Sequence, residues 1–211
     1  MHLLITAGPT WEPIDAVRYV GNRSSGRMGL AIIDAAIRRG WPVTALLGPG
    51  LPDPAVSDSL NVHRFESCAD LEALLAEHFP GCDLLIMAAA VADYRPAEVH
   101  TGKLHRETTG DLTLHLEPTP DLVAACAARK RDDQRILAFA LEDPAVLHQR
   151  AAEKLHRKGV DAIIANPLQT MAASHVDATL LLPDGTTHTP GPTAKPAFAD
   201  WLIDQLDTSP K

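Results

Sequence analysis

Two kinds of hydrophobic pattern alternate along the chain. Short, unbroken apolar runs predict strands that are buried on both faces, because a sheet covered on each side keeps no polar face. These runs lie at residues 3–5, 42–47, 82–90, 135–140 and 161–165, and residues 60–65 alternate like a further strand. Segments with apolar residues at helical spacing lie between them, at residues 30–37, 67–78, 122–129 and 144–158. This alternation predicts an α/β fold, in which a doubly wound, mainly parallel sheet is covered by helices on both faces.

Two segments depart from this alternation. Residues 112–116 alternate as a strand with one polar face, and residues 117–121 predict a turn that caps the next helix. Residues 177–182 and 186–188 predict a hairpin around Asp184-Gly185, before a closing amphipathic helix at 195–206. We expect a single domain over residues 1–211, with an arm or hairpin at about 167–192.

A glycine-rich loop follows the first strand after a long polar excursion. Ser24 or Ser25 can cap the helix that begins there, and Gly26 and Gly29 allow a ligand to approach backbone N–H groups that favour an anion. The spacing of these glycines fits neither G-x-G-x-x-G nor G-x-x-x-x-G-K-[ST]. On spacing alone, both a phosphate-binding loop and a capped, closely packed helix remain open.

Composition narrows the classes of partner. The 211 residues are 45% hydrophobic but only 4% aromatic, so the core must be largely aliphatic. Nineteen basic against 27 acidic residues give a formal charge of −8, which argues against a general nucleic-acid binder. The N-terminus has no positively charged leader and no apolar stretch approaches a membrane span, so we expect a soluble cytoplasmic protein. The three cysteines form no C-x-x-C pair, which favours buried thiols.

Polar side chains follow the ends of the predicted strands. Asp93 follows the strand at 82–90, Lys103 lies in a basic loop, and Lys154 and Lys158 are four residues apart on one helix face. A ligand site at the carboxyl ends of the strands is one interpretation. A turn for Asp93 and a solvated face for the lysine pair is the other. The ten histidines include no H-x-x-x-H pair with a carboxylate between its members, so we expect them to be unliganded.

Six stretches taken together resemble one protein family. They are residues 5–29 (ITAGPTWEPIDAVRYVGNRSSGRMG), 88–96 (AAAVADYRP), 102–104 (GKL), 120–124 (PDLVA), 139–142 (FALE) and 153–166 (EKLHRKGVDAIIAN). Their order and intervals are similar to those of the phosphopantothenoylcysteine synthetases of coenzyme A biosynthesis. The resemblance implies a Rossmann-like fold and a ligase that joins 4′-phosphopantothenate to the amine of L-cysteine through an acyl-nucleotide intermediate.

The resemblance also implies co-substrates and partners. CTP is implied in preference to ATP, with pyrophosphate and CMP as products and with Mg²⁺ on the triphosphate. A homodimer is implied, and the hairpin near Asp184 is a candidate contributor to it. In many bacteria the domain is fused behind a flavin-dependent decarboxylase. Because this chain begins at the synthetase strand, we expect any phosphopantothenoylcysteine decarboxylase to be a separate polypeptide.

Site residues follow from the same resemblance. Asn22 corresponds to the asparagine that holds the acyl-nucleotide intermediate, and Lys103 to the lysine of a mobile loop over the site. Phosphate and nucleotide contacts correspond to Gly8, Ser24, Gly26, Gly29, Asp93, Pro120, Asp121, Leu122, Val123, Phe139, Lys154, Lys158 and Asn166. We expect the substrate to contact Arg18, Ala89 and Ala90.

The chain departs from the family pattern at several positions. Lys103-Leu104-His105-Arg106 stands where Lys-Ile-Lys-Lys is frequent, and Thr119 stands where asparagine is common. Leu141-Glu142-Asp143 replaces Ala-Glu-Thr, and residues 171–177 lack the usual phenylalanine and asparagine. These departures leave open the choice of nucleotide, the substrate contacts and the geometry of the arm.

Two other functions remain open on the sequence. One is a non-catalytic nucleotide-binding paralogue, which would bind nucleotide without turnover. The other is an NAD(P)-dependent oxidoreductase, which the absence of G-x-G-x-x-G and of a Tyr-x-x-x-Lys pair disfavours.

Overall fold

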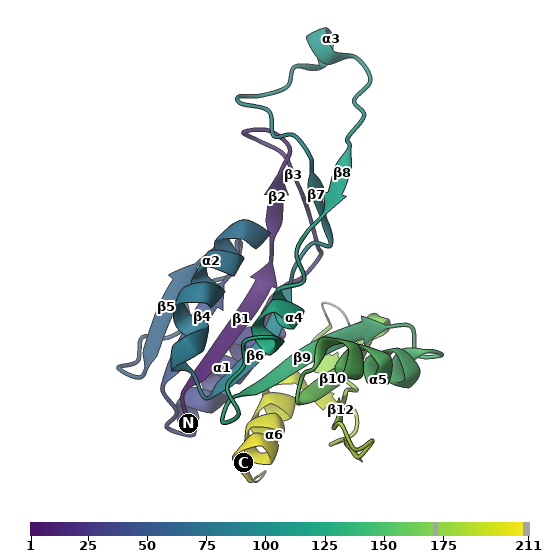
Figure 1. Cartoon of the computed structure of the whole chain (residues 1–211). Coiled ribbons are helices and arrows are strands. Elements are labelled where there is room, and N and C mark those ends of the chain that lie inside the picture. Colours follow the sequence, from purple (N-terminus) through teal and green to yellow (C-terminus); the bar gives the residue numbers. More distant parts are fainter. Residues whose placement is uncertain (171–172, 209–211) are drawn as a thin grey trace.

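The centre of the molecule is an eight-stranded sheet (Figure 1). The computed structural model describes residues 1–170 and 173–208. The strand order is β13-β12-β10-β9-β6-β1-β4-β5, in which the strands from β10 to β5 pair in parallel and β12 and β13 pair antiparallel. Their bounds are β1 Leu3–Pro9, β4 Val43–Leu47, β5 Leu60–Arg64, β6 Leu84–Ala90, β9 Arg135–Glu142, β10 Ala162–Pro167, β12 Thr179–Leu181 and β13 Thr187–His188. The doubly wound α/β fold expected from the alternating pattern is confirmed.

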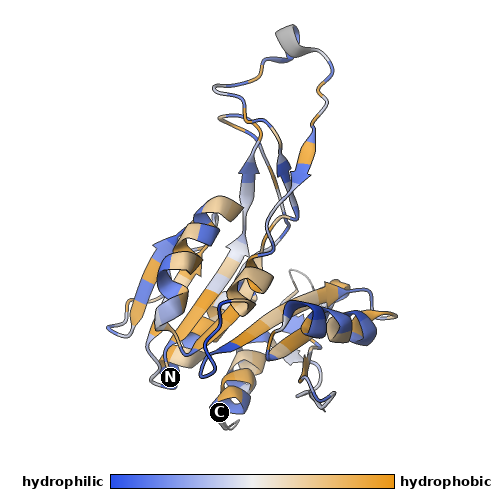
Figure 2. Cartoon of the chain, in the orientation of Figure 1, coloured by the Kyte–Doolittle hydropathy of each residue, from blue (hydrophilic) through white to orange (hydrophobic). Residues whose placement is uncertain are grey.

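Helices cover both faces of this sheet. One layer is formed by α1 (Arg27–Arg38) and α6 (Lys195–Thr208), and the other by α2 (Cys68–His78), α4 (Leu122–Ala127) and α5 (Leu147–Lys158). Within β1, Leu3 and Ile5 pack in the α1 and α6 layer, whereas Leu4 packs in the opposite layer. Figure 2 shows the inner strands as largely hydrophobic. The unbroken apolar runs therefore reflect burial from both sides.

A projecting arm, formed by residues 10–21 and 94–118, extends beyond the carboxyl ends of the strands (Figure 1). It contains two antiparallel pairs, β2 (Trp11–Pro13) with β3 (Tyr19–Gly21) and β7 (Tyr94–Pro96) with β8 (Leu116–Pro118). A short helix, α3 (Arg106–Thr109), lies at its far end. The strand expected at 112–116 is wrong, because β8 begins only at Leu116. Residues 112–115 lie beyond the end of β7 and have no partner strand with which to form a ladder.

The expected hairpin around Asp184-Gly185 is confirmed at the sheet edge. β12 and β13 pair antiparallel, and the Thr186 N–H donates to the Asp184 carboxylate over 2.8 Å. The 3₁₀ turn η2 (Leu168–Thr170) precedes it, and β11 (His175–Val176) pairs with β14 (Thr193–Ala194) around it. A second 3₁₀ turn, η1 (Phe79–Gly81), follows α2. The departure noted at residues 171–177 falls partly outside the described residues, since these omit 171 and 172.

The three cysteines are buried and free, as the sequence predicts. Burial raises the pKa of the Cys68 thiol to about 11 and that of Cys82 to about 12, so both stay protonated at neutral pH. None of the described helices combines the length and the apolar character needed to cross a bilayer.

Asp15 links the two segments of the projecting arm through hydrogen bonds. Its carboxylate accepts hydrogen bonds from the backbone N–H groups of Val17 (2.8 Å), Arg18 (2.8 Å) and Leu104 (3.1 Å), and it pairs with the Arg18 guanidinium at 2.8 Å. Burial alone would raise the pKa of Asp15, but the N–H donors and the Arg18 charge outweigh it and lower the pKa. Asp15 thus joins the β2–β3 hairpin to the loop after β7.

The lowered pKa predicts a pH-dependent contribution to stability. Asp15 stabilises the fold fully above the unfolded carboxyl pKa of about 3.9, and this contribution is lost as the pH falls through the lower folded value. We expect Asp15→Asn to unfold at a lower urea concentration than the wild type at pH 7. The difference should shrink below about pH 4. Urea titrations of both proteins at pH 7, 5 and 3 measure it, and a difference independent of pH contradicts the assignment.

Candidate functional site

Two cavities open at the carboxyl ends of the central strands. The first, which we call the α1 cavity, has a volume of about 490 Å³. It is lined by residues 21–29 and 88–90, Phe139, Leu141, Asn166, Thr170 and Lys195. The second, the α4 cavity, has about 310 Å³ and is lined by Met87, residues 89–91, Asp93, residues 119–123, Ala138, Phe139, Lys154 and Lys158. Ala89, Ala90 and Phe139 line both cavities, so the two spaces adjoin where the strand order reverses between β1 and β6.

Asn22 lies at this junction. Its side-chain nitrogen donates to the backbone carbonyls of Ala90 (3.2 Å) and Val91 (3.0 Å) at the end of β6. Since carbonyl oxygens only accept, the amide nitrogen must face them, and the amide oxygen points elsewhere. The side chain is therefore held in one orientation, on an exposed residue of the α1 cavity wall.

The N-terminus of α1 forms one wall of the α1 cavity. The capping expected from Ser24 or Ser25 is wrong, because the N-cap is Gly26 at φ 64°, with no side-chain cap. Ser24 instead accepts a hydrogen bond from the Gly26 N–H over 3.3 Å. A Cβ atom on Gly26 would lie 2.5 Å from Leu51 Cδ2, so only glycine fits beneath that side chain. The positive end of the helix dipole is thus directed at the cavity without a capping oxygen.

Two lysines and one aspartate form the polar wall of the α4 cavity. Lys158 pairs with Asp121 at 3.0 Å, and Lys154 donates to the Phe139 carbonyl at 2.7 Å. Burial lowers the pKa of Lys154, and the neighbouring Lys158 charge lowers it further. Burial raises the pKa of Asp121, but the Ala124 N–H and Lys158 outweigh this and lower it. The solvated-face interpretation of the lysine pair is wrong, since the Lys158 side chain is only 15% exposed.

The segment before α4 completes this wall. Asp121 is the N-cap of α4 and accepts from the Ala124 N–H over 3.1 Å, as the sequence predicts. This cap places Pro120, Leu122 and Val123 along the cavity. Asp93 lines the same space, and its backbone carbonyl accepts from the Thr119 N–H over 3.0 Å.

Three expected site residues lie outside both cavities. Gly8 (φ 92°) packs under Leu51, where a Cβ atom would lie 2.7 Å from Leu51 Cδ1. Arg18 is bound to Asp15 and donates to the Leu104 carbonyl over 3.1 Å. Lys103 is exposed on the projecting arm. Their roles at the site stay predictions, and for Arg18 and Lys103 they require the arm to approach a cavity.

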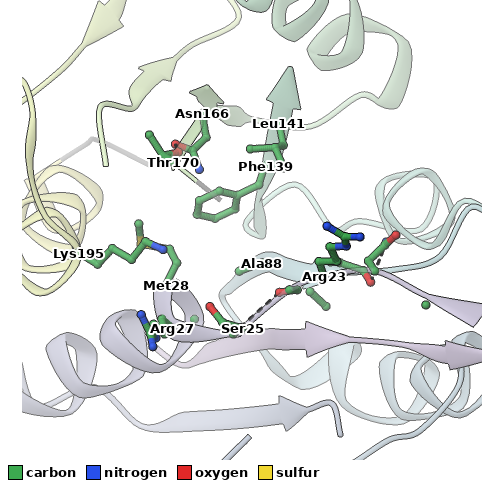
Figure 3. A pocket seen from close by; sticks show the side chains of 17 residues that line it. Arg23, Ser25, Arg27, Met28, Ala88, Phe139, Leu141, Asn166, Thr170 and Lys195 are labelled. Carbon is green, nitrogen blue, oxygen red and sulfur yellow. Dashed lines mark hydrogen bonds between the residues drawn. The ribbon is translucent and has the colours of Figure 1, made fainter. Parts of the chain in front are cut away.

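Sequence reasoning overlooked three cations of the α1 cavity, namely Arg23, Arg27 and Lys195 (Figure 3). Arg23 and Arg27 flank the serine and glycine loop, so their position in the sequence was an available signal. The sequence around Lys195 gave no such signal. Lys195 follows β14 (Thr193–Ala194), and its backbone N–H donates to the Ser174 carbonyl, so the tertiary fold brings it to the cavity. Asn166, which was expected, also lines this cavity, where its side-chain oxygen accepts from the Thr170 hydroxyl over 2.7 Å.

Comparisons with known proteins agree on the domain. The family model for the DNA/pantothenate metabolism flavoprotein C-terminal domain matches residues 1–209. The coenzyme A biosynthesis bifunctional protein CoaBC of Mycobacterium tuberculosis is 38% identical over 221 aligned positions, which cover 98% of this chain and 52% of that protein. A protein named cysteine/cysteine sulfinic acid decarboxylase, from an unknown prokaryotic organism, is 41% identical over 171 positions, 81% of this chain and 47% of its own length.

The solved structures agree as well. The C-terminal domain of a coenzyme A biosynthesis bifunctional protein CoaBC superposes with a TM-score of 0.81 at 31% identity, covering 98% of this chain and 93% of that one. The chain spans about half the length of the curated relatives it matches. It therefore belongs to the DNA/pantothenate metabolism flavoprotein C-terminal domain family, which confirms the resemblance to the phosphopantothenoylcysteine synthetase domain.

Proposed function

We propose that this protein is a phosphopantothenate–cysteine ligase that uses CTP. The observation that carries the proposal is the pair of adjoining cavities with the fixed Asn22 amide at their junction, in a chain of this family. A ligase that activates an acid with a nucleotide must hold both molecules with their reacting ends in contact. The proposal includes a cytoplasmic enzyme and a decarboxylase that consumes its product.

The proposed chemistry has two steps. A carboxylate oxygen of 4′-phosphopantothenate attacks the α-phosphorus of CTP, and pyrophosphate leaves. The cysteine amine then attacks the acyl carbon of the resulting mixed anhydride, loses a proton, and expels CMP as the acyl C–O bond breaks. Both steps need alignment and charge neutralisation more than a strong base, which suits a site built from cations and amide groups.

The two cavities together suit the two substrates. The α4 cavity combines the apolar side chains of Leu122 and Val123 with Lys154 and Lys158, so we assign it to the nucleotide. The α1 cavity contains residues that the resemblance gives to phosphate and nucleotide contacts, namely Ser24, Gly26, Gly29 and Asn166, so we assign its α1 end to the nucleotide phosphates. The acid and the α-phosphate then meet at the shared wall of Ala89 and Ala90, beside Asn22.

The Mg²⁺ of this proposal arrives with the triphosphate. Within residues 1–170 and 173–208, no three or more His, Cys, Asp or Glu side chains are grouped to hold a metal ion. Mg²⁺ on a nucleotide needs only one or two protein carboxylates, because phosphate and water oxygens supply the other ligands. The exposed Asp93 fits this need at the rim of the α4 cavity. When bound, the ion supplies neutralisation of phosphate charge.

Pyrophosphate release tests the proposed function. The purified protein receives 4′-phosphopantothenate, Mg²⁺ and either CTP or ATP, with and without cysteine. We expect pyrophosphate with CTP and cysteine-dependent release of CMP, and an ATP-driven reaction would reassign the nucleotide. Folded protein that is inactive with both nucleotides, yet binds CTP in a calorimeter, would favour the non-catalytic paralogue.

Replacing Lys103 by alanine tests the mobile loop. Because Lys103 lines neither cavity here, it contributes little to CTP binding before the arm closes, and its charge acts mainly as the α-phosphate reacts. We expect kcat to fall roughly 10- to 50-fold while the Kd for CTP changes less than about threefold. Steady-state rates and calorimetry measure the two effects. Equal losses in kcat and in CTP affinity contradict this role.

The projecting arm is our candidate for the surface of a homodimer. Six of the ten large apolar side chains that are exposed in the described part lie on it: Val17, Tyr19, Tyr94, Val99, Leu112 and Leu116. Apolar side chains gathered on one surface mark an interface with a partner. We expect sedimentation to show that the wild type is a dimer. The double variant Tyr94→Ser with Leu116→Ser should form a weaker dimer, which dissociates at a higher protein concentration than the wild-type dimer does. A wild-type monomer at micromolar concentration contradicts the homodimer.

A further inference from the structure

Asn22 is oriented by the chain segment at the end of β6, and two threonines in turn fix that segment. Thr10, which lies between β1 and β2, is fully buried. Its backbone N–H donates to the Ala90 carbonyl over 3.2 Å, and its hydroxyl oxygen accepts from the Ala92 N–H over 3.0 Å. From the other side, the Thr119 hydroxyl donates to the Ala92 carbonyl over 2.6 Å. The end of β6 is therefore held between two distant parts of the chain.

The peptide unit that joins Val91 to Ala92 connects Thr10 with Asn22. This unit is trans, and because a trans peptide unit is planar, its N–H and C=O groups point in opposite directions. The N–H donates to Thr10, and the C=O accepts from the Asn22 amide over 3.0 Å. Thr10 thus fixes the plane that directs the Val91 carbonyl at Asn22. The Ala90 carbonyl accepts from both Thr10 and Asn22, so both carbonyls that hold the amide depend on Thr10.

We propose that Thr10 is a positioning residue for the ligase reaction, which fixes the two carbonyls that orient Asn22, and that Thr119 supports it from the other side of Ala92. The inference rests on the proposed function, because that function places the acyl-nucleotide against the Asn22 amide. Thr10 lines neither cavity, so it acts through Asn22 rather than on a bound substrate. Without the Thr10 hydroxyl, the buried Ala92 N–H loses its partner, and the peptide unit turns to regain one. That rotation carries the Val91 carbonyl away from Asn22.

The first test is Thr10→Val, which keeps the shape of the side chain and removes its oxygen. We expect kcat to fall roughly 10- to 100-fold, since a misplacement of about 1 Å at a reacting group costs up to about 100-fold. The KM values for CTP and for phosphopantothenate should change less than about threefold. Thr10→Ser restores the oxygen and should keep kcat within about threefold of the wild type. An unchanged kcat in Thr10→Val overturns the proposal.

Thr6→Val is the matched control. Thr6 is also fully buried, and its hydroxyl oxygen accepts from another N–H of β6, that of Ala89, over 3.1 Å. This N–H belongs to the peptide unit of Ala88 and Ala89, which contains neither of the carbonyls that hold Asn22. Both valine variants should unfold at a lower urea concentration than the wild type, but Thr6→Val should keep kcat within about threefold. Equal losses of kcat in Thr6→Val and Thr10→Val overturn the proposal.

A double variant distinguishes positioning from a merely structural role. If Thr10 acts through Asn22, its removal has little further effect once the Asn22 side chain is gone. We therefore expect Thr10→Val to lower kcat less than about threefold in the Asn22→Ala background. Losses that multiply in the double variant overturn the proposal.

Thr119→Val keeps the test decisive if Thr10→Val does not fold, because Thr119 is only partly buried. It removes the hydroxyl that holds the Ala92 carbonyl, and we expect kcat to fall at least about threefold. This loss should also disappear in the Asn22→Ala background. A loss that persists there, or an unchanged kcat in Thr119→Val alone, overturns the proposal.

The orientation of the Asn22 amide separates this inference from the proposed function, since it can be measured without turnover. The two side-chain N–H signals of Asn22 in an amide proton–nitrogen NMR spectrum are assigned by their loss in Asn22→Ala. If the wild type forms no product, these signals still decide the inference. We expect Thr10→Val to shift them and Thr6→Val to leave them in place. Signals that Thr10→Val leaves unmoved overturn the positioning role, whether or not the protein is a ligase.

Discussion

Asn22→Ala is expected to lower kcat about 100- to 1,000-fold, the range typical for loss of one preorganised polar group at a reacting centre. The free energy of unfolding should change by less than about 0.5 kcal/mol, because Asn22 is an exposed residue. We expect the loss of kcat because the amide of Asn22 is already oriented in the folded protein. Two carbonyls at the end of β6 hold its nitrogen, so its oxygen meets the acyl-nucleotide without a cost of reorganisation. Pre-steady-state release of pyrophosphate and CMP measures which step is slowed.

Asn22→Asp is the informative partner of this variant. Aspartate has the same shape, but a carboxylate cannot donate to the carbonyls of Ala90 and Val91 and is repelled by them. We therefore expect the aspartate variant to be no more than about tenfold more active than the alanine variant. Near-wild-type activity of Asn22→Asp would show that the two carbonyl contacts do not position the group.

The layered sheet could be predicted because its signal is local. A strand covered on both faces must be apolar at every position, and the run at Leu3, Leu4 and Ile5 records contacts with both helical layers. Helix α2 also lies where the spacing of its apolar residues predicts it, and its first turn is closed by a capping box of Ser67 and Asp70. Patterns of this kind depend on residues a few positions apart.

The arm could not be predicted, because its stability comes from distant partners. β2, β3, β7 and β8 are three residues long and carry no run of apolar residues. The β2–β3 hairpin is held by the stack of Trp11 on Tyr19, with ring centroids 4.1 Å apart, and by Asp15. Glu12 of β2 is buried and accepts a hydrogen bond from the Cys68 N–H at 2.9 Å, although the two residues lie 56 positions apart in the sequence.

The same limit applied to the candidate site. The expected residues of the α4 cavity lie within continuous stretches, such as 120–123, and the structure brings them together. Lys195 of the α1 cavity begins the last helix and reaches the cavity only through the fold. Sequence reasoning therefore described the α4 cavity better than the α1 cavity.

Gly29→Ala is expected to lower the free energy of unfolding by about 3 kcal/mol, the upper part of the range for overpacking a core. Gly29 lies in the first turn of α1, directly over Ala7 of β1. A Cβ atom there would lie 2.3 Å from Ala7 Cβ and 3.3 Å from Ala7 Cα, so the backbone of α1 must move away from the sheet. Urea titration measures the loss.

Two controls isolate the collision between Gly29 and Ala7. Gly81→Ala adds the same methyl group where nothing lies within 4 Å, and should change stability by less than about 1 kcal/mol. Adding Ala7→Gly to Gly29→Ala removes the atom that is struck, so the pair should regain about 2 kcal/mol relative to the sum of the single changes. Strictly additive losses would mean that helix α1 and strand β1 are not in the close contact that keeps the N-terminus of α1 at the cavity. Gly29, which resembles part of a phosphate-binding loop in the sequence, would then be required by the conformation of that loop, rather than by the packing of α1 on the sheet.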